Sequence, residues 1–342
     1  MRGATMKNDI MVSICCLVYN QKKYIRQALD SFLMQKTNFK FEILVNDDCS
    51  TDGTTEIIKE YEEKYPDIIK PLYHSENQYS KSYRQGNMMS ITFNFPRVSG
   101  KYTAMCEGDD FWTDENKLQK QVDFMEDHPE CSFCAHTVRC TNEKGQRTTQ
   151  IIPVKDTVKE GMMTSEEAVD GICRLPYMFQ TTSYFFRSEY LKEMVENTPE
   201  FFEYSSSMDV LFMLYFASKG NVYYMNEEMS CYRHQSTSSI MCELQSNKDN
   251  KKTQKMINHY EYHIKSLKAF NSYTNDRFFK SVDFCIRKSE YHLMLLKGDY
   301  KHLFSKKYKD IAPLFFSKSS KKEKFRMRIL SLFPFLIKLR HK

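Results

Sequence analysis

Long hydrophobic runs are missing from this sequence. The longest one, residues 329–337, is interrupted by Ser331 and Pro334, whereas about 20 consecutive apolar residues are needed to cross a bilayer. The charged start of the chain is also not followed by the apolar segment of about seven or more residues that a secretory signal contains. We therefore expect neither a membrane span nor a leader, and the 11 cysteines fit reduced thiols in a cytoplasm.

A second metal-binding cysteine pair is missing too. Cys131, Cys134 and His136 suggest half of a zinc site, but no matching Cys-x-x-Cys follows them, and tetrahedral zinc needs four ligands. On a strand, residues 131 and 134 also point to opposite faces. We interpret them as buried strand cysteines. The chain shows no internal repeat and no low-complexity linker.

A net positive charge is missing outside the end of the chain. The formal net charge is +6, but residues 301–342 hold 13 Lys and Arg against two acids, Asp310 and Glu323, so that residues 1–300 carry 37 Lys and Arg against 42 Asp and Glu. Nucleic-acid binders spread positive charge over a folded face, so we expect no nucleic-acid partner. Residues 318–342 combine basic and large apolar side chains, which predicts peripheral contact with an anionic membrane surface. Packing of this tail onto the body of the protein is the alternative.

Strand-like and helix-like segments alternate through the first 130 residues. Strands are expected at residues 11–18, 41–45, 68–73 and 102–106, and helices at 24–35, 55–65 and 116–128. Such alternation predicts an α/β fold with a mostly parallel central sheet flanked by helices. Further along, we expect strands at 131–139, 183–187, 221–225 and 229–232, an apolar helix at 208–218 and a helical region from 250 to 310.

Acidic residues follow two of these strands. Asp47 and Asp48 come after the strand at residues 41–45, and Glu107, Asp109 and Asp110 come after the strand at 102–106. Ligands of an open α/β sheet bind at the carboxyl ends of its strands. Carboxylates packed so closely repel one another unless a cation or donor groups offset their charge. The two clusters therefore predict a metal-assisted nucleotide site.

The motifs follow one another in the order typical of a known family. Residues 12–20, 46–53, 107–112 and 117–121 resemble, in this order, the family 2 glycosyltransferases of the bacterial surface-polysaccharide type, and the resemblance covers about residues 10–235. It implies a GT-A fold, which is Rossmann-like, and inverting transfer of a sugar from a UDP-sugar to a hydroxyl of a growing surface glycan, lipid-linked acceptors included. It also implies a divalent cation, Mn²⁺ or Mg²⁺, as cofactor.

The same resemblance implies roles for the strand-end residues. In the family, the corresponding acids contact the nucleoside of the donor, and the closing Tyr-Arg-x-His motif reaches the metal or the diphosphate; here the His comes one residue early. A solvated acidic turn, or a helix cap in the case of Asp52, is the alternative. The candidates for nucleotide binding are Tyr19, Asn20, Asp47, Asp48 and Arg233.

A divalent ion that bridges carboxylate and phosphate oxygens stabilises the charge that develops on a departing nucleoside diphosphate. In an Asp-x-Asp pattern, the small residue between the acids leaves room for the ligand, and Glu107 replaces the first Asp of the family. Asp109 is therefore the stronger candidate ligand, with Glu107 and His234 beside it. Asp110 and Trp112 are candidates for sugar or acceptor contacts, although burial of Trp112 between strand and helix explains this aromatic residue equally well.

Asp209 is the candidate general base. Inverting transfer needs one carboxylate to accept the proton of the acceptor hydroxyl, and the family carries its base at this place in the chain. Asp209 opens an apolar helix, however, so a first-turn acid that is favoured by the helix dipole is the alternative.

We expect three regions: a GT-A domain at residues 1–235, with a nucleotide half at about 10–110 and an acceptor half at about 111–235, a helical region at 236–317, and a basic amphipathic tail at 318–342. A sugar nucleotidyltransferase of the same fold should show a Gly-rich loop after the first strand, but Gln21-Lys22-Lys23 contains no glycine. A non-catalytic sugar-binding or scaffold protein of a membrane assembly remains the other alternative. We expect a cytoplasmic protein that meets the inner face of the cell membrane if the tail binds there.

Overall fold

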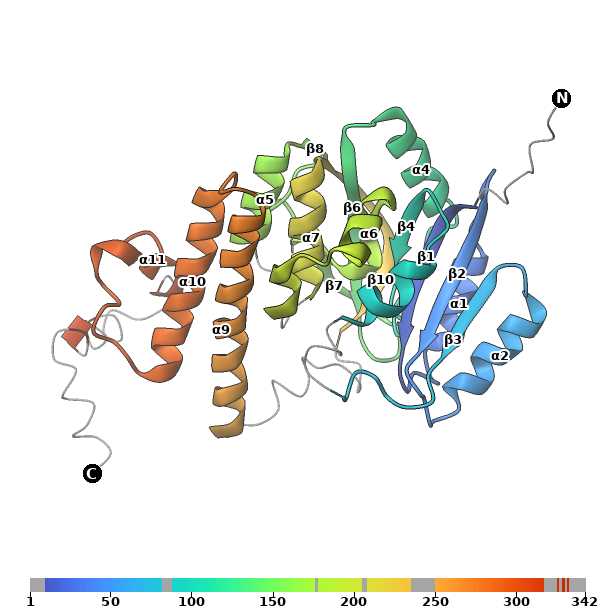
Figure 1. Ribbon diagram of the computed structural model, residues 1–342, viewed down its shortest axis with the longest axis horizontal. Helices are drawn as coiled ribbons and strands as arrows, with labels where there is room; N and C mark the ends of the chain where they lie inside the picture. Colours follow the sequence, from blue (N-terminus) through green and yellow to red (C-terminus); the bar gives the residue numbers. More distant parts are fainter. Residues whose placement is uncertain are drawn as a thin grey trace. The chain divides into compact units, whose positions relative to one another are not determined.

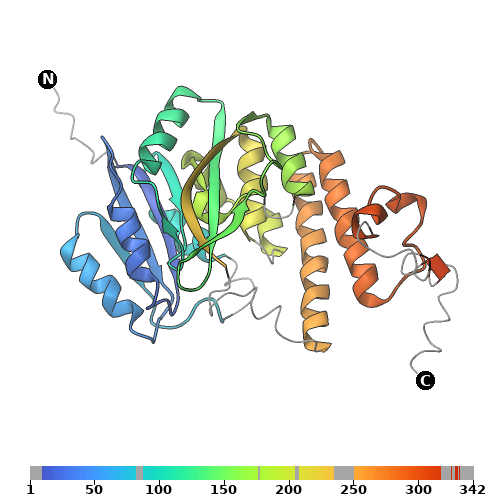
Figure 2. The same cartoon turned by 180° about the vertical axis from the view of Figure 1, so that it is seen from behind.

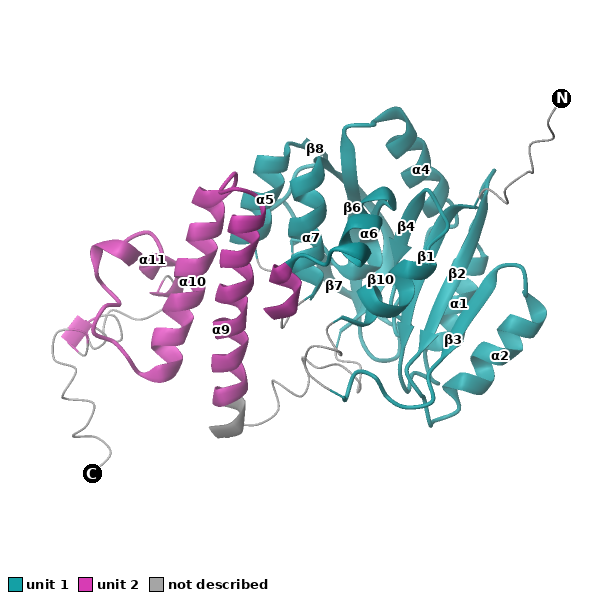
Figure 3. Cartoon of the chain, viewed as in Figure 1, with its two compact units in different colours: residues 1–199, 207–246 teal, residues 200–206, 247–342 magenta. Residues whose placement is uncertain are grey.

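The computed structural model describes residues 10–81, 88–175, 178–204, 208–234 and 250–316, together with Phe325, Arg328, Ile329 and Ser331. The chain divides into two compact units (Figure 3), residues 1–199 with 207–246 and residues 200–206 with 247–342. Most of the basic tail predicted at residues 318–342 lies outside the described residues. No helix in the described ranges is long and apolar enough to cross a membrane.

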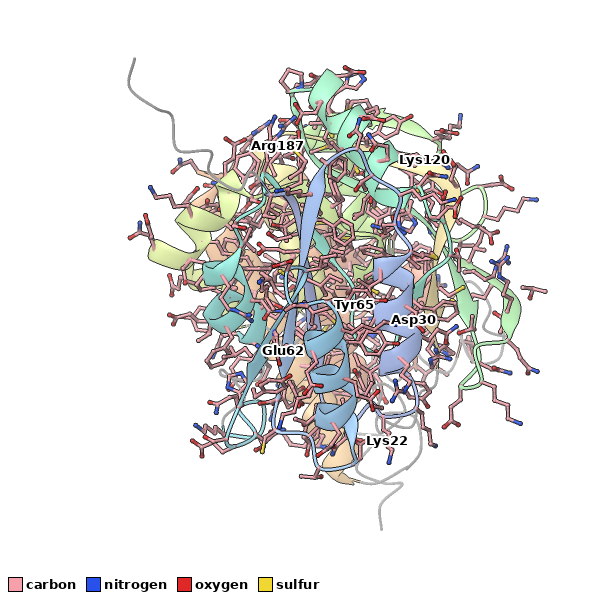
Figure 4. All side chains as sticks on the ribbon, turned by 90° about the vertical axis from the view of Figure 1, so that its right-hand side faces the viewer. Lys22, Asp30, Glu62, Tyr65, Lys120 and Arg187 are labelled. Atoms are coloured by element: carbon pink, nitrogen blue, oxygen red, sulfur yellow. The ribbon has the colours of Figure 1, made fainter. Side chains whose placement is uncertain are left out.

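The first half of the first unit is a parallel βαβ array. Strands β1 (Ile10–Val18), β2 (Lys40–Asp47), β3 (Ile69–Tyr73) and β4 (Tyr102–Met105) pair in the order β3-β2-β1-β4, and every pairing is parallel. Helices α1 (Ile25–Leu33) and α2 (Thr54–Lys64) connect the first three strands and lie side by side (Figure 4). The hydroxyl of Tyr61 on α2 donates to Asp30 on α1 over 2.6 Å. The alternation of strands and helices in the sequence is thereby confirmed.

The second half of the sheet is mixed. It continues from β4 through β9 (Phe185–Arg187), β6 (Cys131–Thr141) and β10 (Asn221–Arg233) to β5 (Phe111–Trp112), with β7 (Arg147–Ile152) paired to β6 and β8 (Gly161–Met163) paired to β10. The only parallel pairing among these described strands is that of β10 with β6. The predicted α/β sheet is confirmed, and most of its parallel pairings lie among β1, β2, β3 and β4.

The two short strands predicted near residue 225 are in fact one long strand, so this prediction was wrong. Strand β10 continues through Asn226, Glu227 and Glu228, with register shifts against β6 around Glu228. Such β-bulges leave extra residues unpaired and bend the strand. The polar interruption in the sequence therefore marks a bulge and not a turn.

Helices cover the sheet on both faces (Figures 1 and 2). Helices α1 and α2 lie on one face, and α6 (Glu189–Glu196) and α7 (Met208–Lys219) lie on the other. The first unit also contains α4 (Lys117–Asp127), α5 (Ser165–Arg174), a π-helical turn at Ser90–Asn94 and 3₁₀ turns at Phe95–Arg97 and Thr181–Ser183.

The second unit is helical. It contains a 3₁₀ turn at Glu200–Tyr204, the two long helices α9 (Asn250–Tyr273) and α10 (Phe279–Lys297), a 3₁₀ turn at Lys306–Tyr308 and the short helix α11 (Ala312–Phe316). Its core includes Tyr291, Leu303 and Ile311, none of which has exposed surface. The predicted helical C-terminal region is thereby confirmed.

Candidate active site

The loop after β1 is fastened to the loop after β2. The backbone N–H of Asn20 donates to Ser50 Oγ over 2.9 Å, and the Asn20 side-chain oxygen accepts from the Thr51 N–H over 2.8 Å. Asn20 has a φ of 51°, a left-handed conformation in which Asn is enriched. Asn20 therefore shapes this edge, and a nucleotide contact by its side chain stays a prediction.

Lys22 lies at the carboxyl end of the parallel strands (Figure 4). Lys120 and Arg187 lie at the amino end of these strands. The N–H of Lys22 donates to Asp52 over 3.0 Å, and the other oxygen of that carboxylate accepts from the Thr54 N–H at the start of α2. Gly53 is the N-cap of α2, and no side chain forms a cap bond there, so the helix-cap interpretation of Asp52 was wrong: Asp52 joins the two loops instead.

Tyr19 opens this loop with its side chain outward. The residue is 44% exposed directly after a buried strand. An accessible ring at the carboxyl end of the sheet can stack on a base or pack against a ribose. The prediction that Tyr19 contacts the nucleotide is consistent with this position.

Asp47 and Asp48 are buried and bind the chain's own polar groups. Asp47 accepts from the Ser50 N–H over 3.1 Å and from the Thr55 hydroxyl. Asp48 accepts from the backbone N–H groups of residues 78 and 79 over 2.6 and 3.0 Å. These bonds order the loops that surround the predicted nucleotide position. Direct contact of either carboxylate with a nucleoside stays a prediction.

The acidic loop after β4, residues 107–110, packs closely against the loop after β1. The N–H of Gly108 donates to the Leu17 carbonyl over 3.0 Å. A Cβ atom at Gly108 would lie 2.4 Å from Gln21 Oε1 and 2.9 Å from a methyl group of Val18. The interpretation of Gly108 as a space for ligand was therefore wrong, because the chain's own side chains fill the space. Any larger residue here would push the acidic loop away from β1.

Glu107, Asp109 and Asp209 influence one another electrostatically. Desolvation, and then the charges of Asp109 and Asp209, raise the pKa of Glu107 above its ordinary value, although the residue is exposed at the surface. Asp209 opens α7, more than 90 residues after the acidic loop. The fold therefore brings the predicted base and the predicted metal ligands to one site.

Tyr184 links these groups, and nothing in its sequence context indicated this. Its hydroxyl donates to the backbone carbonyl of Asp209 over 3.3 Å. Burial raises the pKa of the Tyr184 phenol, and the charges of Asp209 and Glu107 raise it further. Tyr184 therefore stays neutral and fixes the first turn of α7 as a hydrogen-bond donor.

Asp110 and Arg233 form a buried clamp on the acidic loop. The backbone N–H of Arg233 donates to Asp110 Oδ1 over 2.8 Å, and the guanidinium Nε donates to the Asp109 carbonyl, also over 2.8 Å. Asp110 is only 1% exposed, and its Oδ2 has no hydrogen-bond partner. The predicted contact of Asp110 with sugar or acceptor is corrected accordingly, because its carboxyl faces the protein interior.

Every nitrogen of the Arg233 guanidinium donates a hydrogen bond to another residue of the protein. Its Nη1 donates to the Glu143 carbonyl over 3.1 Å, and its Nη2 donates to Gln27 Oε1 over 2.9 Å. The guanidinium lies 4.5 Å from the ring centroid of Tyr24, and Arg233 is 2% exposed. The predicted phosphate contact is therefore corrected: Arg233 positions the acidic loop.

Arg233→Lys should weaken both the fold and the binding of the donor. Lysine keeps the positive charge but cannot replace the three directed guanidinium bonds, so we expect a loss of about 1–3 kcal/mol in the free energy of unfolding. UDP affinity should fall as well, because Asp109 is no longer held. Denaturant unfolding and calorimetry measure the two effects.

Arg139→Lys on β6 is the matched control for this variant. Arg139 pairs with Glu228 at the surface, and surface pairs are worth at most about 1 kcal/mol. Equal losses in the two variants, with unchanged UDP affinity, would contradict the clamp.

Trp112 belongs to the core. It is 2% exposed, lies edge-on to Phe32 at 4.8 Å, and donates from Nε1 to the Thr182 carbonyl over 3.2 Å. Lys117 Nζ lies 4.0 Å above its ring and donates to Gln121 over 2.7 Å. Sugar stacking by Trp112 is therefore corrected in favour of packing between strand and helix.

Cys131, Cys134 and His136 have no exposed surface on β6, in agreement with buried strand residues. No group of three His, Cys, Asp or Glu side chains within the described ranges is placed to hold a metal ion. Magnesium, however, is typically held by one or two carboxylates together with substrate phosphates. Glu107 and Asp109 fit that donor set, because a cation would offset the repulsion that raises the pKa of Glu107. His234 is half-buried, and its role as a ligand stays a prediction.

Known proteins are similar to part of this sequence. An uncharacterized protein of Mycobacterium tuberculosis strain H37Rv is 40% identical over 147 residues, which are 42% of this chain and 39% of that protein. TuaG of Bacillus subtilis, named as a teichuronic acid biosynthesis glycosyltransferase, is 34% identical over 123 residues, 36% of this chain and 44% of that protein. The matches thus span about two fifths of the relatives' length.

Solved structures share the fold. S. aureus TarS, residues 1–349 in complex with UDP, aligns with a TM-score of 0.56 at 17% identity and covers 94% of this chain and 79% of TarS 1–349. The complex of the same TarS fragment with UDP-GlcNAc aligns with a TM-score of 0.57, also at 17% identity, and covers 92% of this chain and 78% of that chain. At this identity the likeness speaks for the fold alone, which is the GT-A architecture expected from the sequence.

The family model of glycosyl transferase family 2 matches residues 13–194. This range begins within β1, includes the acidic loop and ends within α6, and it covers more than half of the chain. The chain therefore belongs to glycosyl transferase family 2.

Proposed function

We propose that this protein transfers a sugar from a UDP-sugar to a hydroxyl of a bacterial surface glycan, with inversion at the anomeric carbon. Its family and the fold that it shares with TarS, which has been solved with UDP and UDP-GlcNAc, support the donor class. TuaG is named for teichuronic acid biosynthesis, and this name supports a bacterial surface glycan as the acceptor. The observation that carries the proposal is that the charges of Asp109 and Asp209 both act on Glu107, which follows β4 at the carboxyl end of the parallel strands.

Asp209 would act as the general base. As the acceptor hydroxyl attacks the anomeric carbon, its proton moves to the Asp209 carboxylate, while the bond from that carbon to the β-phosphate oxygen breaks and its electron pair leaves with UDP. The Tyr184 hydroxyl donates to the backbone carbonyl of Asp209, so this bond does not involve the carboxylate. The base therefore has a fixed position without losing its acceptor atoms to that bond.

Asp109, with Glu107, would hold the divalent cation. The cation supplies charge stabilisation to the departing diphosphate. The chain's own part is to fix the carboxylates: Gly108 allows the close approach to β1, and Arg233 holds the Asp109 carbonyl. Tyr19 would contact the base or ribose, with Asp47 and Asp48 ordering the loops around it.

Release of UDP tests the proposed function. The full-length protein is incubated with UDP-sugars one at a time, with Mn²⁺ or with EDTA, and with GDP- and CDP-sugars for comparison. We expect slow hydrolysis of at least one UDP-sugar that requires the cation. No turnover of any UDP-sugar, or a clear preference for another nucleotide, would contradict the proposal and would favour a non-catalytic sugar-binding protein.

We also propose that the protein acts in the cytoplasm at the inner face of the cell membrane, through its tail. The charge of residues 318–342 supports this. Co-sedimentation with anionic vesicles, compared between the full chain and a chain that ends at Lys318, measures the contribution of the tail.

A further inference from the structure

The second unit contains a cavity of its own. Its volume is about 880 Å³, within the range of roughly 300–1,000 Å³ that is typical of small-molecule sites. It is bounded by the turn at Lys306–Tyr308 and by α11, and apolar side chains form most of its walls: Phe304, Tyr308, Ala312, Pro313 and Phe316. The rings of Phe304 and Phe316 stack at 5.7 Å, and Phe304 is 37% exposed. The walls suit a flexible apolar group.

Three cations also line this cavity. Lys306 begins the 3₁₀ turn and Lys309 follows it, both with exposed side chains, and the Arg328 guanidinium lies 5.7 Å from the Phe304 ring centroid. None of the three forms an ion pair with an acid in the part of the chain that the structure describes. The cavity therefore combines apolar walls with positive charge that no described acid offsets.

Neighbouring cations of the same unit are paired. Arg287 binds Asp310 over 2.5 Å, and Lys307 binds Glu290 over 2.6 Å. Lys307 belongs to the same turn as Lys306. Only Lys307 is paired with an acid among the described residues, so the pairing depends on where each side chain points and not on the local sequence. Asp310 and Glu290 are thus paired with cations that do not line the cavity.

We propose that this cavity binds an anionic phospholipid of a membrane surface. An acyl chain would lie against Phe304 and Phe316, and the phosphate would lie among Lys306, Lys309 and Arg328. A wholly apolar ligand would leave three cations without a counter-charge, and inorganic phosphate would leave the apolar walls unused. The binding is independent of glycosyl transfer and does not require residues 332–342.

Calorimetry with dihexanoyl phosphatidylglycerol below its micellar concentration tests the cavity. A monomeric lipid offers no charged surface, so non-specific attraction to the basic tail contributes little. We expect saturable binding by the full-length protein, and a loss of about tenfold or more in the variant Lys306→Gln/Lys309→Gln, because an exposed ion pair between a lysine and the phosphate is worth up to about a factor of five.

Lys268→Gln/Lys280→Gln is the matched control. Both lysines are exposed on α9 and α10 of the same unit and line no described cavity, and the change in net charge is the same. We expect unchanged binding in this control and clearly weaker binding of dihexanoyl phosphatidylcholine, which is zwitterionic. Equal losses in the two double variants would overturn the site. An absence of saturable binding, as when the chain's own residues 332–337 fill the cavity, would overturn it too.

Binding to vesicles tests whether the cavity takes its lipid from a membrane surface. Full-length protein should bind phosphatidylcholine vesicles that contain phosphatidylglycerol, and Lys306→Gln/Lys309→Gln should lower that binding more than the control does. Binding of the monomeric lipid without any such difference on vesicles would contradict a membrane source.

Discussion

Replacing Asp209 with Asn is expected to lower the rate of sugar transfer by about 10²- to 10⁴-fold, because the amide keeps the size of the side chain but cannot accept a proton. Affinity for the donor should stay nearly unchanged, since Asp209 contributes to the chemical step and not to nucleotide binding. Transfer kinetics and UDP calorimetry of the same preparation separate the two effects. The position of Asp209 near Glu107 and Asp109 motivates this expectation.

Glu189→Gln tests the alternative that Asp209 is only a first-turn acid. Glu189 opens α6 as Asp209 opens α7, so both acids experience a helix dipole. A dipole role predicts similar, small losses of stability in the two variants and no selective loss of rate. If Asp209→Asn retains more than half of the wild-type rate, the base is another residue.

Asp109→Asn is expected to abolish the dependence of UDP binding on Mn²⁺. The substitution removes the carboxylate that we assign to the cation, and it relieves repulsion in the acidic loop, so the fold should be retained or slightly stabilised. Calorimetric titration of UDP with Mn²⁺ or with EDTA measures this dependence. Wild-type affinity in the presence of Mn²⁺ would remove Asp109 from the metal site.

Asp110→Asn is the control for this variant, with the opposite expectation. Burial, and then the charge of Asp109, raise the pKa of Asp110 well above its ordinary value, so the folded protein disfavours the charged form of this carboxyl. An acid whose pKa is higher in the folded state costs stability as pH rises above its ordinary pKa. Asparagine can still accept from the Arg233 N–H and does not ionise. Asp110→Asn should therefore retain UDP binding and unfold at a higher temperature than wild type at pH 8, with a smaller difference at pH 4.

Local sequence patterns predicted the parallel half of the sheet and the placement of its loops. The apolar run of β1 and the helical spacing in α1 are properties of a few neighbouring residues, and the carboxyl ends of parallel strands meet by topology. Asp47 and Glu107 could therefore be placed at one edge from sequence. The convergence of Asp209 with that edge rested on the family resemblance.

The burial of side chains could not be predicted in this way. Arg233, Trp112 and Asp110 lie in or beside motifs, yet each is enclosed by residues that are distant in sequence, such as Gln27 for Arg233 and Phe32 for Trp112. The bulge in β10 depends on its pairing with β6, and the link from Tyr184 to Asp209 depends on packing between β9 and α7. A motif indicates that a residue is needed, whereas only its neighbours decide whether it binds ligand or holds the loop that does.

Amide hydrogen exchange of the full-length protein with UDP and Mn²⁺ tests the central claim most directly, because it locates the donor. We predict slower exchange in three segments at the carboxyl ends of β1, β2 and β4, namely residues 17–22, 47–54 and 105–110, and no change in α9 and α10. Protection confined to other segments, or no protection at saturating UDP, would contradict the assignment of the donor site to this edge of the sheet.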